Sequence, residues 1–343
     1  MKRLEAELAR LTPAHFAMVM ATGIVSLAAH LLRLPGLGRA LFDLNIVLYA
    51  ALCVLTVLHA VRAPRAFFGD MVDHRHGPVY FTIVAATGVL GSQFALLSGG
   101  YRAAAVLWVV ALVLWVLLTY VIFAGFTIAK TKPALEQGIG GGWLLAVVAT
   151  QSIAVLAALL APRAGATGRL ALNFLALSMW LWAGMLYIWI MALIFYRTTF
   201  FAFTPADLAP PYWINMGAMA ISTLAGTLLI HNAPQAPFLV SLLPFLKGFT
   251  VFYWATGTWW IPLLVVLAFW RYVWTRFPLK YDPLYWGAVF PLGMYAASTE
   301  EMIAAMQLDF LRPLPRVFLY VALAAWAAAF AGFAAHLLRR VRP

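Results

Sequence analysis

Ten apolar runs of about 20 residues divide this 343-residue chain, and they constrain its fold more than any other feature. A helix needs about that length to cross the hydrocarbon core of a bilayer, where unpaired backbone groups find no partner. The chain is 65% hydrophobic and only 10% charged, so it has too few polar residues to coat a soluble globule of this size. We therefore predict spans at about 13–32, 41–61, 78–98, 102–126, 142–161, 170–196, 212–230, 249–271, 284–306 and 317–338.

The predicted fold class is an all-α integral membrane protein with a single transmembrane domain over residues 1–343. A membrane β-barrel is excluded because stretches such as 103–118 and 319–338 show no alternation of apolar and polar residues. The single cysteine, Cys53, offers neither a disulfide framework nor a cysteine metal site. The formal net charge of +12 reflects short basic runs between the spans, which indicate orientation and not nucleic-acid binding.

Lysine and arginine are distributed unequally between the two sets of loops. With a cytoplasmic N-terminus, 15 of the 23 lie on the inner side, which predicts that both termini are cytoplasmic and that the number of spans is even. These inner residues are Lys2, Arg3, Arg10, Arg62, Arg65, Arg75, Lys130, Lys132, Arg197, Arg271, Arg276, Lys280, Arg339, Arg340 and Arg342.

Polar side chains alternate along the chain. The odd-numbered spans hold 16 Ser, Thr, Asn and Gln residues and the even-numbered spans hold eight. Polar groups avoid lipid, so we predict five helical hairpins around a central pore lined by the odd-numbered helices. The alternative for any single residue is that it only permits close helix packing. The candidate pore-lining residues are Thr22, Gly23, Ser26, Thr87, Gly88, Gln93, Thr150, Gln151, Ser152, Asn215, Ser222, Thr223 and Gly293.

Several motifs resemble those of a known family. Residues 16–26 read FAMVMATGIVS and residues 286–295 read WGAVFPLGMY, and both are similar to signatures of the tellurite-resistance/dicarboxylate transporter family. Shorter stretches at 149–155, 211–217 and 246–249 also resemble that family, so the likeness covers nearly the whole chain. One departure is Ala21, where the family pattern has glycine.

This resemblance implies a fold and a class of function. The family includes a bacterial tellurite-resistance protein, a fungal malate permease and sulfite efflux pump, and plant slow-type anion channels. It implies ten helices as five hairpins around a pore, often assembled as a homotrimer with one pore in each subunit. Small inorganic or dicarboxylate anions are then the expected substrates: malate, sulfite, chloride, nitrate or tellurite.

The resemblance also implies a gate. In channels of this family a phenylalanine on the ninth helix blocks the pore, and the matching pair here is Phe290 and Pro291. Pro291 removes one backbone hydrogen bond and kinks the helix, while the adjacent ring is large enough to close a hydrophobic constriction. The alternative is an ordinary packed phenylalanine beside a kink.

Glu300 and Glu301 are adjacent acids inside the ninth predicted span. At 100° per residue, Glu301 shares the face of Phe290 to within about 20°. One hypothesis is a proton-coupled carrier whose acidic site is neutralised by a proton. The alternative is an interfacial pairing with Lys247, Arg312 or Arg316 near the outer membrane surface.

Two further sets of charged residues are candidates for a function. Lys247, just before the eighth predicted span, is a candidate charge at the outer mouth, and snorkelling to lipid headgroups is the alternative. Asp70, Asp73, His74 and His76 resemble a metal site only loosely, and a solvated loop is favoured.

Three functions compete at this point. An anion channel or uniporter is favoured, with a proton-coupled anion carrier as the alternative and a membrane-embedded enzyme as a remote one. Neither a His-rich set, a Cys pair nor a Ser/His/Asp arrangement lies within the predicted spans, so we expect no catalytic residues, metal or cofactor. The partners expected are small anions and the lipid bilayer, without nucleic acid. An alanine- and arginine-rich chain with short loops favours a bacterial inner membrane.

Overall fold

The computed structural model describes residues 12–279 and 281–341, and within them it is helical without a β-strand. Five of the basic residues counted for the membrane orientation lie outside the described part of the chain: Lys2, Arg3, Arg10, Lys280 and Arg342. Ten helices in this part are 16 residues or longer. They are α2 (Phe16–Leu31), α3 (Pro35–Arg62), α5 (Phe81–Leu97), α6 (Tyr101–Ile128), α8 (Leu145–Leu160), α9 (Ala166–Phe200), α10 (Ile214–Asn232), α12 (Leu243–Phe269), α13 (Trp286–Met306) and α14 (Pro313–Val341).

Nine of these helices, among the residues that are described, are long and apolar enough to cross a membrane. The tenth, α13, carries Ser298, Thr299, Glu300 and Glu301 in its second half and is not one of the nine. It nevertheless packs against α2, α10 and α14, so it belongs to the same bundle. The chain is an all-α membrane protein, as its sequence predicts.

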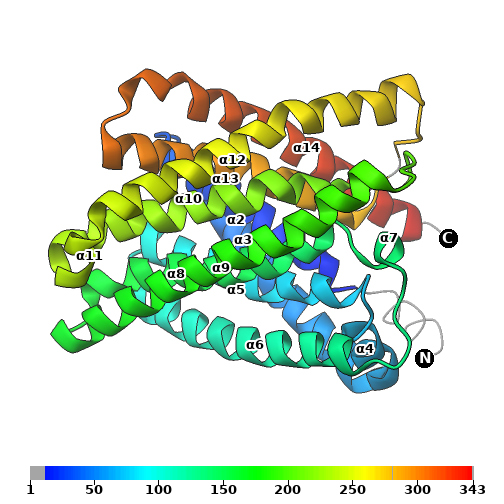
Figure 1. Cartoon of the computed structure of the whole chain (residues 1–343), viewed down its shortest axis with the longest axis horizontal. Coiled ribbons are helices and arrows are strands. Elements are labelled where there is room, and N and C mark those ends of the chain that lie inside the picture. Colours follow the sequence, from blue (N-terminus) through cyan, green and yellow to red (C-terminus); the bar gives the residue numbers. More distant parts are fainter. Residues whose placement is uncertain (1–11, 280, 342–343) are drawn as a thin grey trace.

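Short helices connect the long ones at the two ends of the bundle. Figure 1 shows α4 (Pro64–Met71) and α7 (Leu135–Gly138) at the end where α14 finishes, and α11 (Pro237–Ser241) at the opposite end. The long helices run roughly along the horizontal axis of the view between these ends. Consecutive long helices therefore alternate in direction, and the five odd-numbered spans are parallel to one another.

The five odd-numbered spans form a closed ring. Helix α2 contacts α5, α5 contacts α8, α8 contacts α10, α10 contacts α13, and α13 contacts α2 again. For the four ring helices that qualify as spans, 78–94% of residues in the most apolar window are buried, compared with 11–50% for the even-numbered spans. The even-numbered spans are α3, α6, α9, α12 and α14, and they form an outer layer around the ring. They expose many large apolar side chains, such as Val106 on α6 and Phe174 on α9, which fits a lipid-facing layer.

Each ring helix begins with a short 3₁₀ turn. These turns are Pro13–His15, Gly77–Tyr80, Gly141–Leu144, Pro210–Trp213 and Pro283–Tyr285. Four of them have proline in their first two positions, where the missing N–H costs no hydrogen bond. Helix α12 begins at Leu243, six residues before the predicted span at 249–271, because Pro244 fits its first turn in the same way. Lys247 therefore lies inside this helix and not before it.

Glycines allow adjacent ring helices to approach closely. A Cβ atom on Gly217 of α10 would lie 2.7 Å from Cγ of Pro291 on α13. A Cβ atom on Gly88 of α5 would lie 2.8 Å from the side chain of Ser152 on α8. Both positions therefore require glycine for the observed helix separation.

Candidate functional site

Two cavities lie on the axis of the ring. We name them after the predicted orientation: the inner cavity, of about 20 Å³, is lined near the N-terminal ends of the ring helices, and the outer cavity, of about 50 Å³, is lined by their C-terminal halves. All five helices or their leading 3₁₀ turns contribute to each cavity. A path along the centre of the ring would therefore pass through both cavities.

Helix α13 and its leading turn supply one continuous stripe of residues to this axis. Leu284, Gly287 and Phe290 line the inner cavity, and Met294, Ala297 and Glu301 line the outer one. The spacing of three and four residues keeps these side chains on one face of the helix. Helix α2 and its leading turn repeat the same spacing with Ala14, Ala17, Met20, Ile24, Leu27 and Leu31.

Phe290 lies where the stripe passes from one cavity to the other. Its side chain is only 1% exposed, and the next stripe residue, Met294, already lines the outer cavity. Pro291 follows inside the helix and packs against Gly217 of α10. Phe290 is therefore the last residue of α13 that lines the inner cavity, in a tightly packed position.

The walls of both cavities are mainly apolar. Of the predicted pore-lining residues, Gly88 and Ser152 line the outer cavity. Ser92 also lines it, although it was not among the candidates. Glu301 is the only charged residue among the described residues that line these two cavities.

Most of the other candidates direct their polar groups away from the ring axis. Trp326 of α14 donates a hydrogen bond to Thr22 (2.9 Å), and Trp115 of α6 donates one to Thr150 (2.8 Å). On α3, Asn45 donates to Gln93 (2.7 Å). Further bonds of this kind join Ser26 to the Gly38 carbonyl, Thr87 to Tyr49, and Gln151 to the Trp180 carbonyl. Asn215 differs, because Tyr187 donates to its backbone carbonyl and its side-chain Oδ1 is buried without a partner among the described residues.

The remaining candidates have packing or backbone roles. Thr223 donates to the carbonyl of Met219, one turn earlier on the same helix, and Ser222 accepts from Gln151 (2.8 Å) between two ring helices. Gly23 packs against Val89 and Asn45, and Gly293 packs against Ile24 and Val25. The polar residues of the ring helices therefore largely make contacts between helices. Such contacts are favourable because a polar group surrounded by hydrocarbon needs a protein partner.

Glu301 has a different partner from those considered on the sequence. Its Oε2 lies 3.8 Å from Nδ1 of His231, at the C-terminal end of α10, and its side chain is 22% exposed. Arg312 instead pairs with Asp309 (2.8 Å), and no ion pair joins Glu301 to Lys247 or Arg316 within the described chain. The reason is geometric, since α10 and α13 are neighbours in the ring. Lys247 is exposed on α12, outside the ring.

Arg197 of α9 is a buried cation near the opposite end of the ring. It donates to Asp207 (3.0 Å), to the hydroxyl of Tyr212 (2.9 Å) and to the carbonyl of Glu136 (2.7 Å). Hydrogen bonds from Thr204, and secondarily the Arg197 guanidinium, hold the pKa of Asp207 below its ordinary value. This network fixes the loop before α10 and satisfies the buried charge.

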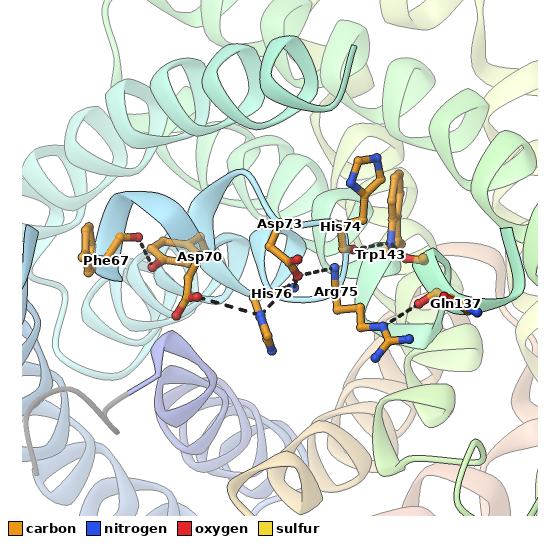
Figure 2. Close-up of polar contacts among 10 residues, drawn as sticks. Phe67, Asp70, Asp73, His74, Arg75, His76, Gln137 and Trp143 are labelled. Carbon is orange, nitrogen blue, oxygen red and sulfur yellow. Dashed lines mark hydrogen bonds and ion pairs between the residues drawn. The ribbon is translucent and has the colours of Figure 1, made fainter. Parts of the chain in front are cut away.

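Asp70 lies at the end of α4, and Asp73, His74 and His76 lie in the segment that follows, where local contacts hold them (Figure 2). Asp73 accepts backbone N–H bonds from Arg75 (2.8 Å) and His76 (3.0 Å), while His76 Nδ1 lies 3.1 Å from Asp73 and 3.9 Å from Asp70. The ring of His74 turns away and stacks on Phe126. The described residues contain no group of three or more His, Cys, Asp or Glu residues suited to a metal ion.

Comparison with known proteins identifies the family. The sequence profile of the voltage-dependent anion channel family SLAC1 matches residues 10–334. The chain belongs to this family. An uncharacterized membrane protein of Mycobacterium tuberculosis is 38% identical over 152 residues, which are 44% of this chain and 77% of that protein. Two uncharacterized transporters of Methanocaldococcus jannaschii are each 25% identical over 83–84% of this chain and 82% of their own lengths.

Family membership and architecture agree on the general function. The chain is a multi-pass membrane protein of a family of anion channels and transporters, and its general activity is anion transport. This agreement also confirms the resemblance stated from the helix motifs, because the match extends over all ten long helices as far as residue 334.

Proposed function

We propose that this protein conducts small anions through the centre of the five-helix ring, as a channel or uniporter gated by Phe290. The observation that carries the proposal is the pair of cavities on one axis, with Phe290 at their junction on the α13 stripe. A large apolar ring at a narrow point excludes water, and an ion cannot pass without it. Opening then requires the Phe290 ring to move from the axis.

The helix directions support a preference for anions. Because the five ring helices are parallel, their N-terminal ends all lie at the mouth of the inner cavity. Each helix N-terminus carries a partial positive charge and unpaired N–H groups. The inner mouth attracts anions in this way without a fixed basic side chain, which would hold a permeating ion too tightly.

The anions proposed are malate or other C4-dicarboxylates, sulfite, chloride, nitrate and tellurite. The family is described as a voltage-dependent anion channel, and the mainly apolar cavity walls do not favour one of these anions over another. We further propose a homotrimer in a bacterial inner membrane with both termini in the cytoplasm, and no enzymatic activity, cofactor or resident metal.

Flux in proteoliposomes tests the channel. We expect Phe290→Ala to raise anion flux severalfold, because the smaller side chain opens the junction of the two cavities to water. The matched control is Phe42→Ala: Phe42 is also 1% exposed but lies on α3 against Phe94, away from both cavities. Equal flux in the Phe290 variant and the unmodified protein, with both folded, would remove Phe290 from the gate. The same vesicles loaded with each anion in turn identify the substrate.

A proton-coupled anion carrier is the second candidate. Glu301 lines the outer cavity and faces His231 at 3.8 Å, so two titratable groups meet at the outer mouth. Protonation of the carboxyl group would remove a negative charge that repels an arriving anion. A channel gives currents that reverse at the anion equilibrium potential, whereas a coupled carrier shifts its reversal with the pH gradient.

A further inference from the structure

A third cavity, of about 190 Å³, lies behind α13 and outside the central ring axis. Its wall includes Ala288 and Leu292 of α13. Each of these residues is two positions from Phe290, or about 200° around the helix, so they face away from the pore. The other walls come from the 3₁₀ turn before α10 and from the C-terminal part of α12 with the turn that follows it. The cavity is therefore distinct from the conduction path.

Arg271 is the one basic residue that lines this cavity. Its side chain is only 6% exposed, yet Nε and Nη1 have no hydrogen-bond partner among the described residues. Its neighbours are aromatic: the guanidinium lies 4.2 Å from the ring centre of Phe277 and 5.2 Å from that of Tyr272. Cation–π contacts do not satisfy the N–H groups, so this arginine carries a buried charge and unused donors.

The contrast with Arg197 shows how a buried arginine is ordinarily accommodated in this chain. Arg197 is buried to a similar degree and donates to a carboxylate, a hydroxyl and a carbonyl. Arg271 has space beside it instead of such partners. An anion with several oxygens would supply them, because a guanidinium presents paired N–H donors to a phosphate or carboxylate group.

The local backbone also departs from a regular helix here. Arg271 lies in a π-helical turn, Trp270–Trp274, that follows α12, and the N–H of Thr275 bonds to the carbonyl of Trp270. Such turns are rare and occur often at functional sites. Tyr272 and Tyr285, whose hydroxyls are 3.0 Å apart, add two polar groups to the same wall.

We propose that this cavity binds a phosphate group, held by Arg271 between α12 and α13. The cavity is several times the volume that one water occupies in the liquid, about 30 Å³, so it has room for a phosphate. It lies at the predicted cytoplasmic end, beside exposed apolar residues of the outer layer such as Phe269 and Trp274. Anionic lipid headgroups concentrate at that surface and bind basic pockets between membrane helices. Free phosphate is the other source of the same chemistry.

Thermal unfolding of the detergent-purified protein tests the site with two probes, inorganic phosphate and dioctanoyl phosphatidylglycerol. We expect one or both probes to raise the unfolding midpoint. Arg271→Gln is expected to weaken the binding about ten- to a hundredfold, the usual worth of hydrogen bonds to a charged group. The matched control is Arg276→Gln, which removes the same charge from an exposed position five residues later and keeps the response.

A second variant keeps the test decisive if Arg271→Gln does not fold. Ala268→Met leaves Arg271 in place and fills the cavity from α12, so it is expected to weaken binding as well. A response to the lipid alone assigns the site to a headgroup, and a response to inorganic phosphate alone assigns it to the free ion. The proposal is overturned if neither probe stabilises the unmodified protein, or if Arg271→Gln and Ala268→Met respond as Arg276→Gln does.

Discussion

Phe290 and Met294 are consecutive members of one stripe on α13, but they line different cavities. Phe290 is followed by Pro291, which cannot donate a backbone hydrogen bond and whose ring rests on Gly217. A weakened helix ladder next to a bulky pore residue gives a local place for movement. In the proposed gating scheme, only the segment around Phe290 and Pro291 needs to move, since the rest of the ring is closely packed.

At the outer mouth, Glu301→Gln separates the two proposed transport modes. If Glu301 carries the coupled proton, the amide variant keeps anion movement but loses the shift of the reversal potential with the pH gradient, because an amide does not titrate in this range. The measurement is current reversal at several pH gradients. Glu300→Gln, which neutralises the adjacent carboxylate outside the described cavity linings, is the matched control. An unchanged pH-dependent shift in both variants would remove Glu301 from proton coupling, and the absence of any shift in the unmodified protein would favour the channel.

At the scale of single helices, three consecutive residues of α8 have three different roles. Thr150 faces outward to Trp115 of α6, and Ser152 lines the outer cavity. Gln151 between them bonds to α9 and α10. One helix thus bonds to α6 and α9 of the outer layer, joins α10 of the ring and contributes to the wall of the outer cavity.

Two substitutions on α8 distinguish these functions. Thr150→Val is expected to lower the stability by about 1 kcal/mol, because the Trp115 N–H loses its partner, and to leave anion permeability ratios unchanged. Ser152→Ala is expected to change those ratios with little loss of stability. Unfolding midpoints and bi-ionic reversal potentials are the measurements. If only the Thr150 variant changed the permeability ratios, Thr150 and not Ser152 would line the conduction path.

The contact between α10 and α13 is the second feature at this scale. Gly217→Ala is expected to destabilise the protein by about 1–3 kcal/mol, the usual cost of overpacking, because the new Cβ would meet the rigid Pro291 ring. Gly248→Ala on the exposed face of α12, where a Cβ meets nothing within 4 Å, is the control. It should be neutral or slightly stabilising, since alanine favours a helix. Equal unfolding midpoints for the two variants would contradict this account of the helix contact.

The whole molecule is a ring of five helices inside an apolar outer layer. Each hairpin of the chain places one helix in the ring and one outside it, so the ring closes after five hairpins when α13 meets α2. The joints between the layers are buried hydrogen bonds such as Asn45 to Gln93 and Trp326 to Thr22. The outer layer exposes large apolar side chains, as a surface that faces lipid does.

The proposed pore lies within one chain, which predicts how an oligomer would behave. We expect a homotrimer by native mass spectrometry, with three separate pores. In mixed assemblies of unmodified and Phe290→Ala subunits, the excess conductance should rise in proportion to the number of variant subunits. A monomeric mass, or a steep dependence that needs all subunits to carry the variant, would contradict independent pores.

The sequence by itself determined the membrane fold, the helical class and the alternation of inner and outer helices. These follow from the length and polarity of each run, which are local properties that lipid imposes on every segment. Family membership was also available from the motifs on α2 and α13, and Phe290 was named from one of them. The predicted role of Phe290 stays a proposal for the flux experiment to test.

Only the tertiary structure decided which side each polar group faces. Thr22, Thr150 and Gln93 were pore candidates because they are polar and lie on odd-numbered helices, yet their partners are on α14, α6 and α3. The pairing of Glu301 with His231 and the unsatisfied donors of Arg271 were equally hidden. The physical reason is that hydrocarbon drives a polar group toward any protein partner, and helix packing alone determines whether that partner lies across the pore or in the outer layer.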